Sequence, residues 1–205
     1  LEDQRCIFFP LFMTGYVIAD LLLDNDWFAV EQILIGSASS KTGFSTAAFI
    51  RAAGFQGAIA GLTSDQNVAF SEALGCYDRV VPYSEVGSIA NEPSAYIDIA
   101  GDVEVRSRLH RSLQNNAAHT LLVGATHWDQ FGQSVDGEPF SGSEPQVFLA
   151  PAQIEKRDGE WGRGVMMGKA YAASIELVSR LAPTLLMESQ TGAEACDAIW
   201  QSLLR

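Results

Sequence analysis

Short aliphatic runs alternate with helical stretches along the chain, and this alternation constrains the fold more than any other feature. The clearest example is Glu31–Gly36 (EQILIG), an apolar run that ends in glycine and leads through small residues into a helix ending near Gly54. Strands buried on both faces of a parallel sheet have such continuous apolar runs, and strands that alternate with helices form βαβ units. The sequence therefore predicts a doubly wound parallel α/β sheet of six or seven strands.

The remaining elements are expected to follow the same alternation. We expect further strands at 57–62, 79–81, 94–99, 118–124, 146–150 and 184–188, and helices at 65–74, 102–115, 164–182 and 191–204. The first 26 residues are expected to form a lead-in and a helix, with Pro10 in the first helical turn. Residues 125–145 break the alternation, and so long a loop in a compact domain is usually functional or mobile.

The composition argues against several classes of function. Asp and Glu number 25 against 13 Lys and Arg, which gives a formal net charge of −12. Such a surface repels nucleic acid and anionic membranes, and no apolar run approaches the roughly 18 residues of a membrane span. We therefore expect no nucleic-acid partner and no membrane partner, and, without a signal-peptide pattern, a cytoplasmic location.

The cysteines and histidines do not have the spacing of a metal site. Three scattered thiols (Cys6, Cys76 and Cys196) form neither a CxxC pair nor a disulfide framework, so we expect buried or idle thiols. The three histidines, at 110, 119 and 127, do not complete a zinc ligand set. We expect His110 to be solvated on its helix and His119 to be packed at the start of a strand.

The turn after the first strand, GSASSKTG, carries the main functional prediction. Where a buried strand turns directly into a helix, backbone N–H groups and the positive end of the helix dipole create a site for a phosphate or pyrophosphate. Four side chains could add hydroxyls or charge: Ser39, Ser40, Lys41 and Thr42. Gly43 would allow the helix to pack closely on the sheet. The structural alternative is a plain helix start with Ser39 or Ser40 as N-cap.

The end of the second strand indicates which dinucleotide is bound. NAD-preferring domains place Asp or Glu there to bind the ribose 2′-hydroxyl. Here hydroxyl and amide side chains come first (Thr63, Ser64 and Asn67), and they could bind a 2′-phosphate, which favours NADP(H). Asp65 is counter-evidence, unless it is a first-turn acid stabilised by the helix dipole. Ala100 and Gly101 end the fourth strand, where they suit either close approach to the cofactor or a simple turn.

From ILIGSASSKTGFST to DRVVPY, the sequence resembles the cofactor domain of medium-chain dehydrogenases/reductases, in the zinc-independent, quinone-oxidoreductase-like branch. That family has Ala-x-Gly-Gly-Val-Gly after the strand, and ASSKTG, residues 38–43, occupies this place with the last glycine kept. PLFMTGYVIADLL is similar to the family's linker helix, and LLMESQTGAEACDAIWQSLLR to its closing strand and helix. SASSKT, GLTSDQNVAF and VGATHWD resemble an uncharacterised branch without an assigned reaction.

The resemblance implies a division of the protein. Residues 1–26 would be a linker segment and helix, and residues 27–205 an NADP(H)-binding Rossmann domain. A β-rich catalytic domain would precede Leu1 and is absent from this chain. Related reductases extend their sheet across a dimer at the strand corresponding to 146–150, so we also expect a homodimer.

The resemblance also assigns residues to the cofactor. Thr14 on the linker helix would lie near the nicotinamide, and Tyr83 matches the tyrosine after the third strand. The end of the fifth strand would face the nicotinamide through Val123, Gly124 and Ala125. His127 could donate a proton there; the alternative is a structural loop histidine.

Three functions remain open from the sequence. The first is NADP(H)-dependent hydride transfer to a small-molecule carbonyl or activated alkene. The second is a nucleotide-binding or redox-sensing module without catalysis. The third, a Rossmann-like methyltransferase, would require an acid at the tip of the second strand, which Thr63 does not supply.

Overall fold

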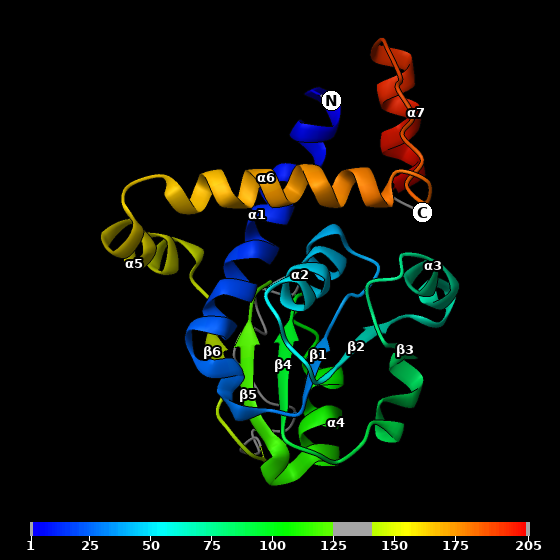
Figure 1. The fold of residues 1–205 in the computed structure, drawn as a ribbon. Helices are drawn as coiled ribbons and strands as arrows, with labels where there is room; N and C mark the ends of the chain where they lie inside the picture. The colour runs from blue at the N-terminus through cyan, green and yellow to red at the C-terminus, as the bar shows by residue number, and fades with distance from the viewer. Residues whose placement is uncertain (1, 125–140, 204–205) are drawn as a thin grey trace.

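The computed structural model describes residues 2–124 and 141–203, and six of its strands form one sheet (Figure 1). The strand order is β3-β2-β1-β4-β5-β6, and every neighbouring pair is parallel. The strands are β1 (Gln32–Ile35), β2 (Ala58–Thr63), β3 (Arg79–Pro82), β4 (Ser94–Asp98), β5 (Ala117–Leu122) and β6 (Gln146–Val147). The predicted doubly wound parallel sheet is confirmed, with six strands.

Helices cover both faces of the sheet (Figure 1). The α-helices are α1 (Glu2–Asp24), α2 (Lys41–Ala52), α3 (Val68–Ala73), α4 (Val103–Leu113), α5 (Ala150–Trp161), α6 (Val165–Leu181) and α7 (Ala193–Leu203). Short 3-10 turns are η1 (Asp26–Ala29), η2 (Asp65–Asn67), η3 (Tyr83–Ser88) and η4 (Gln114–Asn116). Helices α1, α2 and α6 share one apolar cluster with the sheet, and α4 and η3 share another on the opposite face. Because both faces are covered, all four residues of β1 are buried.

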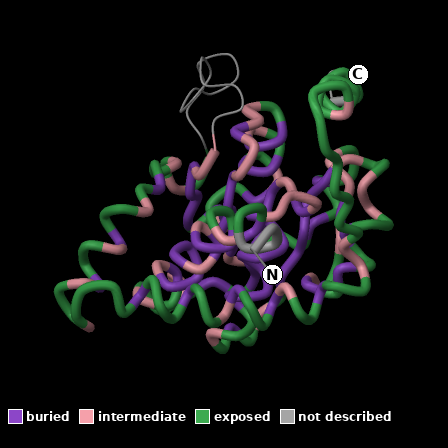
Figure 2. Tube along the Cα trace, turned by 90° about the horizontal axis from the view of Figure 1, so that it is seen from above, coloured by how far each residue is buried: buried purple, intermediate pink, exposed green. Residues whose placement is uncertain are grey.

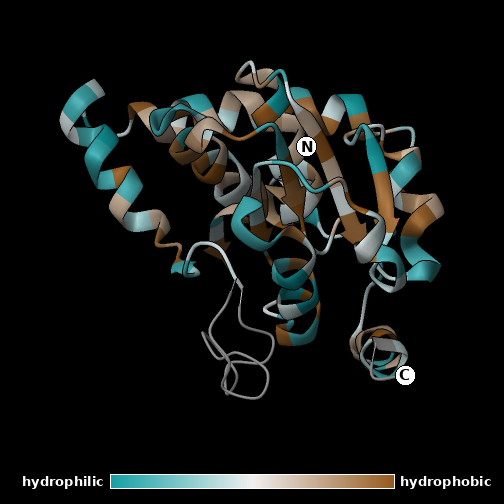
Figure 3. Ribbon diagram, turned by 90° about the horizontal axis from the view of Figure 1, so that it is seen from below, coloured by the Kyte–Doolittle hydropathy of each residue, from teal (hydrophilic) through white to brown (hydrophobic). Residues whose placement is uncertain are grey.

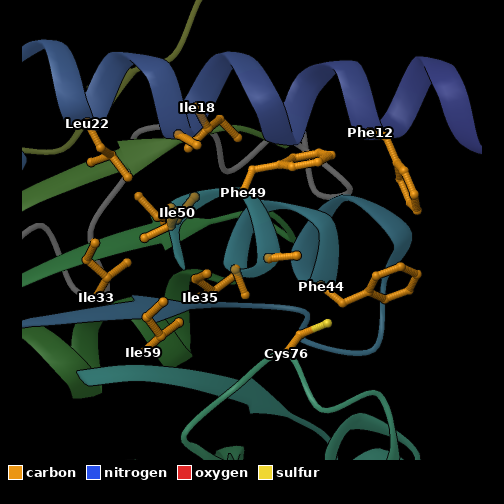
Figure 4. Close-up of a cluster of buried hydrophobic side chains, with 14 of the residues drawn as sticks. Phe12, Ile18, Leu22, Ile33, Ile35, Phe44, Phe49, Ile50, Ile59 and Cys76 are labelled. Atoms are coloured by element: carbon orange, nitrogen blue, oxygen red, sulfur yellow. The ribbon is translucent and has the colours of Figure 1, made fainter. Parts of the chain in front are cut away.

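The larger cluster joins α1 and α2 to the sheet (Figure 4). Phe12, Ile18 and Leu22 of α1 are each 0% exposed and point toward the side chains of α2. The two helices approach closely at Gly15, where a Cβ atom would lie 2.5 Å from the Ser45 hydroxyl oxygen. In Figure 3 the apolar residues concentrate on the strands, whereas polar residues lie on the outer helices.

Helix α1 is longer than the sequence suggested, since Pro10 lies well inside it and not in its first turn. The helix extends toward the N-terminus because Phe8 is buried against the core. The expectation that no apolar run approaches the length of a membrane span is wrong, because residues 6–24 are long and apolar enough to cross a membrane, with a mean hydropathy of 2.0; half of this window, however, is buried in the domain. Because α2 and α6 pack on it, its apolar character is explained by its place in the core.

The turn η1 between α1 and β1 is left-handed without any glycine. Asp26, Trp27, Phe28 and Ala29 all have positive φ, from 49° to 56°. This conformation costs about 1–2 kcal/mol per residue for L-amino acids. Ring contacts hold the turn, because Phe28 stacks on His119 at 3.7 Å and Trp27 packs against Phe55 at 5.2 Å.

The C-terminal part differs most from the prediction. The strand expected at 184–188 does not form, because this segment lies beside α2 and α3 at a pocket, away from a free sheet edge. Helix α7 forms as expected, but the face carrying Ile199 and Trp200 is exposed, at 43% and 61%. Figure 2 shows this helix exposed almost throughout. Before α7, the Arg157 guanidinium lies over the Trp161 ring, 4.6 Å from its centroid.

The prediction that His110 is solvated is wrong, since its side chain is buried on α4. Its Nδ1 atom lies 2.7 Å from the Ser141 carbonyl oxygen, and its Nε2 atom lies 2.9 Å from the Thr120 hydroxyl oxygen. The helix face carrying Leu109 and Leu113 turns His110 inward too, against β5. His119 is packed, as expected.

These two histidines predict a stability that depends on pH. Burial lowers the pKa of both His110 and His119 below the ordinary value of 6.5. Each therefore stabilises the fold fully above about pH 6.5, and this contribution is lost as the pH falls toward the folded pKa, with a slope of up to about 1.4 kcal/mol per pH unit for each histidine. Urea unfolding between pH 7.5 and 5.5 should show this slope, and the H110Q/H119Q variant should lose most of it. An unchanged slope in the variant would contradict the assignment.

Candidate functional site

The fold places a candidate site where β1 and β4 lie side by side. The chain runs outward from β1 through β2 to β3 and then returns to β4 on the other side of β1. Open α/β sheets bind ligands at the carboxyl ends of the strands at such a switch point. The β1–α2 turn and the ends of β2, β4 and β5 meet there, and they carry most of the residues that the sequence singled out.

The β1–α2 turn combines a capped helix with open amide groups. Ser40 is the N-cap of α2, and its hydroxyl oxygen accepts a hydrogen bond from the Gly43 amide at 3.0 Å. Within the described residues, the amide N–H groups of Ser39, Lys41 and Thr42 have no acceptor. The two interpretations of this turn are therefore compatible, because one serine caps the helix and the remaining amides stay available to an anion.

Gly43 is required by the geometry of the turn. A Cβ atom at this position would lie 2.5 Å from the Ser37 carbonyl oxygen, a backbone atom that has little room to move. We predict that Gly43→Ala lowers the free energy of unfolding by about 1–3 kcal/mol, as overpacking usually does. The matched control is Gly168→Ala on α6, where a Cβ meets nothing within 4 Å and stability should rise by about 0.5–1 kcal/mol. Equal effects in chemical denaturation would refute this role of Gly43.

The tip of β2 reaches the same turn. The Thr63 hydroxyl donates to the Ser39 hydroxyl oxygen at 3.4 Å, so these two predicted site residues come together. Ser64 and Asn67 also lie together, because the Asn67 amide donates to the Ser64 hydroxyl oxygen at 3.0 Å. Asp65 begins η2 and accepts a hydrogen bond from Ser84 at 3.0 Å. Its carboxylate is thus held toward η3.

Asp98 organises the ends of β4 and β5. Its side chain accepts from the Gly101 amide at 2.8 Å and pairs with Arg106 of α4 at 2.5 Å, and both charged side chains are at most 1% exposed. Its carbonyl oxygen accepts from the amides of Val123 and Gly124. Burial raises the pKa of the Asp98 carboxyl, and the hydrogen bond from Arg106 opposes this shift.

The two strand ends approach each other at Gly124. A Cβ atom there would lie 1.8 Å from the Ile99 carbonyl oxygen, so only glycine fits. The backbone of 99–101, which includes Ala100 and Gly101, thus forms one surface with the backbone of 123–124 at the carboxyl edge of the sheet. The sequence indicated these backbone positions but not the Asp98–Arg106 pair that fixes them.

Other predicted site residues lie differently. The Thr14 hydroxyl donates to the Pro10 carbonyl oxygen within α1, and the structure gives it no hydrogen bond to the turn. The Tyr83 hydroxyl oxygen accepts from the Ser37 amide at 2.9 Å, so Tyr83 contacts the turn itself. Ala125 and His127 lie outside the described residues. Among the described residues, no group of three or more His, Cys, Asp or Glu side chains could hold a metal ion.

A pocket of about 290 Å³ lies next to the turn. Ser39 and Lys41 line it with Phe44 and Phe70, and residues 185–188 form its C-terminal side. Lys41 is half-buried at the first residue of α2, where a positive side chain is disfavoured by the helix dipole. A bound anion would remove this unfavourable interaction.

The strand order and the all-parallel pairing define a Rossmann-type α/β domain, with open amide groups in the turn at its switch point. The chain belongs to the family described as "Protein of unknown function (DUF2855)", whose model matches residues 1–205. A search of curated protein sequences found no match.

Solved structures share this fold at low sequence identity. An enoyl thioester reductase mutant from Candida tropicalis aligns with a TM-score of 0.52 and 11% identity, over 92% of this chain and 55% of the reductase. An Etr1p mutant in complex with NADP and crotonyl-CoA aligns with a TM-score of 0.51 and 10% identity, over 93% and 56%. A putative NADPH:quinone reductase from Bacillus thuringiensis aligns with a TM-score of 0.51 and 16% identity, over 77% and 49%. The chain spans about half the length of these proteins, and at this level of identity they share its fold alone.

Proposed function

We propose that this chain is the NADP(H)-binding domain of a zinc-independent reductase of an uncharacterised medium-chain branch. The observation that carries the proposal is the β1–α2 turn, where open amides and Lys41 converge at the switch point of the sheet. A dinucleotide phosphate is the ligand that such a turn suits best. The NADP complex of the Etr1p mutant, on the same fold, supports the choice of cofactor.

The proposed residues divide the cofactor into three parts. The pyrophosphate would be bound by Ser39, Ser40, Lys41 and Thr42, with Ser40 contributing mainly as the helix cap. The 2′-phosphate would be bound by Thr63, Ser64 and Asn67. The hydrogen bond from Thr63 to Ser39 supports this division, because it places the end of β2 next to the residues proposed for the pyrophosphate. The nicotinamide would lie against the surface at 100–101 and 123–125, with Thr14 near it.

The reaction that we propose is reduction of a small-molecule carbonyl or activated alkene. NADPH, when bound, supplies a hydride to the electrophilic carbon. The protein would orient the nicotinamide ring, exclude water and provide a proton for the oxygen or the neighbouring carbon. We assign that proton to His127, because it follows β5 closely in the sequence.

The whole protein would need further parts. We propose a β-rich catalytic domain, since the similar structures have about as much chain again beyond the matched half. We also propose a homodimer through β6, an edge strand where Val147 and the following Leu149 are 53% and 62% exposed. We propose a cytoplasmic location, because the three cysteines are free thiols, as is usual in a reducing compartment, and the net charge is acidic.

A module without catalysis is the second candidate. Asp98 and Arg106 form an ion pair at the carboxyl ends of β4 and β5. Both side chains are buried, and Asp98 bonds the neighbouring backbone, so this pair has a structural role and not one in chemistry on a substrate. A redox sensor would need only the binding surface and this support.

Titration of the chain with NADPH and NADH, followed by nicotinamide fluorescence, tests the proposal. We expect saturable binding with NADPH bound more tightly than NADH. Binding of S-adenosylmethionine in place of either dinucleotide would favour a methyltransferase, and no binding at all would refute the proposal. Turnover with carbonyl and enoyl substrates, measured on the full-length protein, separates the reductase from the sensor.

A further inference from the structure

The β1–α2 turn adopts a tight conformation with few glycines. Between the strand and the helix, ASSKTG stands where the resembling family has Ala-x-Gly-Gly-Val-Gly. Ser37 has a φ of 53°, in the left-handed region that glycine adopts without steric cost and serine does not. Contacts from outside the turn must therefore offset this cost.

Three tyrosine hydroxyls lie against consecutive residues at the start of the turn, two of them in hydrogen bonds and one in close approach. The Ser37 amide donates to the Tyr83 hydroxyl oxygen at 2.9 Å, and the Tyr77 hydroxyl donates to the Ala38 carbonyl oxygen at 2.9 Å. At Gly36, a Cβ atom would lie 2.8 Å from the hydroxyl oxygen of Tyr96. The tyrosines come from three separate places: the turn before β3, η3 and β4.

The surroundings are built to accept these rings. Gly61 of β2 leaves room for the turn, because a Cβ there would lie 2.7 Å from the Ala38 Cβ and 3.0 Å from the Tyr77 ring. Burial raises the pKa of Tyr77, and its neighbours Cys76 and Tyr83 raise it further. The Tyr77 hydroxyl therefore stays protonated and remains a donor to the turn.

We propose that Tyr77 and Tyr83 are positioning residues that hold the phosphate-binding turn in the conformation that glycines would otherwise allow. Tyr83 fixes the left-handed Ser37 through its amide, and Tyr77 fixes the next carbonyl, so that the amides of 39, 41 and 42 face the ligand. The inference deepens the proposed function and rests on it. It gives Tyr83 a role through the turn in place of direct contact with the cofactor.

The test is NADPH affinity in Tyr83→Phe and in the Y77F/Y83F double variant. Loss of one such hydrogen bond should weaken binding about 2- to 10-fold, and loss of both about 5- to 100-fold. Tyr171→Phe, at an exposed position on α6, is the matched control and should bind as the unchanged protein does. Affinity equal to that of the unchanged protein in Y83F and in the double variant would overturn the proposal.

Rescue by glycine separates positioning from direct contact. Ser37→Gly removes the conformational cost that Tyr83 offsets, so S37G/Y83F should bind NADPH within about 2-fold of S37G alone. A loss that persists in S37G/Y83F would show that Tyr83 touches the ligand and would refute the positioning role.

Amide hydrogen exchange at Ser37 provides a readout without any ligand. Exchange at Ser37 should be slow in the unchanged protein and at least about 5-fold faster in Y83F, because its acceptor is lost. If the unchanged chain binds no dinucleotide, the proposed function fails, and exchange at Ser37 still decides whether Tyr83 holds the turn. Equal exchange rates would refute that contact.

Discussion

Replacing Arg106 with Met is expected to lower the free energy of unfolding by about 3–5 kcal/mol, the usual effect of removing one partner of a buried ion pair. Arg106 and Asp98 are 1% and 0% exposed, so water cannot replace the lost partner. The Asp98 carboxyl also holds the Gly101 amide, and its carbonyl oxygen holds the end of β5. The variant should therefore also weaken binding at the proposed nicotinamide surface.

The pH dependence of this loss identifies its cause. Burial already raises the pKa of Asp98, and removing Arg106 raises it further, above the unfolded value near 3.9. A raised carboxyl pKa destabilises the fold progressively as the pH rises above the unfolded value, so the loss in R106M should be larger at pH 8 than at pH 5. Urea unfolding at the two pH values measures it.

Two further variants make this prediction specific. In D98N/R106M, the uncharged amide oxygen can still accept from Gly101, so more than half of the lost stability should return. Arg111→Met, at an exposed position on the same helix, should change stability by less than about 1 kcal/mol. Equal destabilisation of the single and double variants would show that the charge of Asp98 is not the cause.

The sequence predicted those parts of the molecule whose cause is local. An apolar run, small residues and a helix start follow one another from Glu31 to Ala52, and they suffice to predict β1, the turn and α2. The contact of Ser39 with Thr63 also follows from strand order alone, because parallel neighbours bring their carboxyl ends to one edge.

The features that the sequence missed depend on packing between distant segments. Nothing near Asp98 indicates that Arg106 turns inward, and His110 appeared solvated because its sequence neighbours are Arg108 and Arg111. The left-handed turn η1 contains no glycine to indicate it.

The expected strand at 184–188 is the reverse case, because its local sequence favours a strand and the structure forms none. Its residues, TLLME, suit a strand, but a strand also needs a free sheet edge beside it. The segment lies instead at the pocket beside Ser39 and Lys41.

Lys41→Ala is expected to weaken NADPH binding about 10- to 100-fold, the range of one charge-assisted hydrogen bond to a phosphate. Lys41 begins α2 beside the open amides and lines the adjacent pocket. Because a cation at a helix N-terminus opposes the dipole, the variant without ligand should be equally stable or up to about 1 kcal/mol more stable. Weaker binding with unchanged or higher stability would thus separate a ligand contact from a structural role.

Comparing cofactors shows which phosphate Lys41 binds. If it binds the pyrophosphate, as we propose, NADPH and NADH should lose affinity by the same factor, since both carry that group. A loss confined to NADPH would move Lys41 to the 2′-phosphate and revise the assignment. Lys41→Arg should retain most of the affinity, and Lys169→Ala, where the ammonium lies over the Trp161 ring, is the control for a change of net charge elsewhere. Unchanged affinity in Lys41→Ala would remove this side chain from the site, because a phosphate at the α2 N-terminus could not avoid so close a charge.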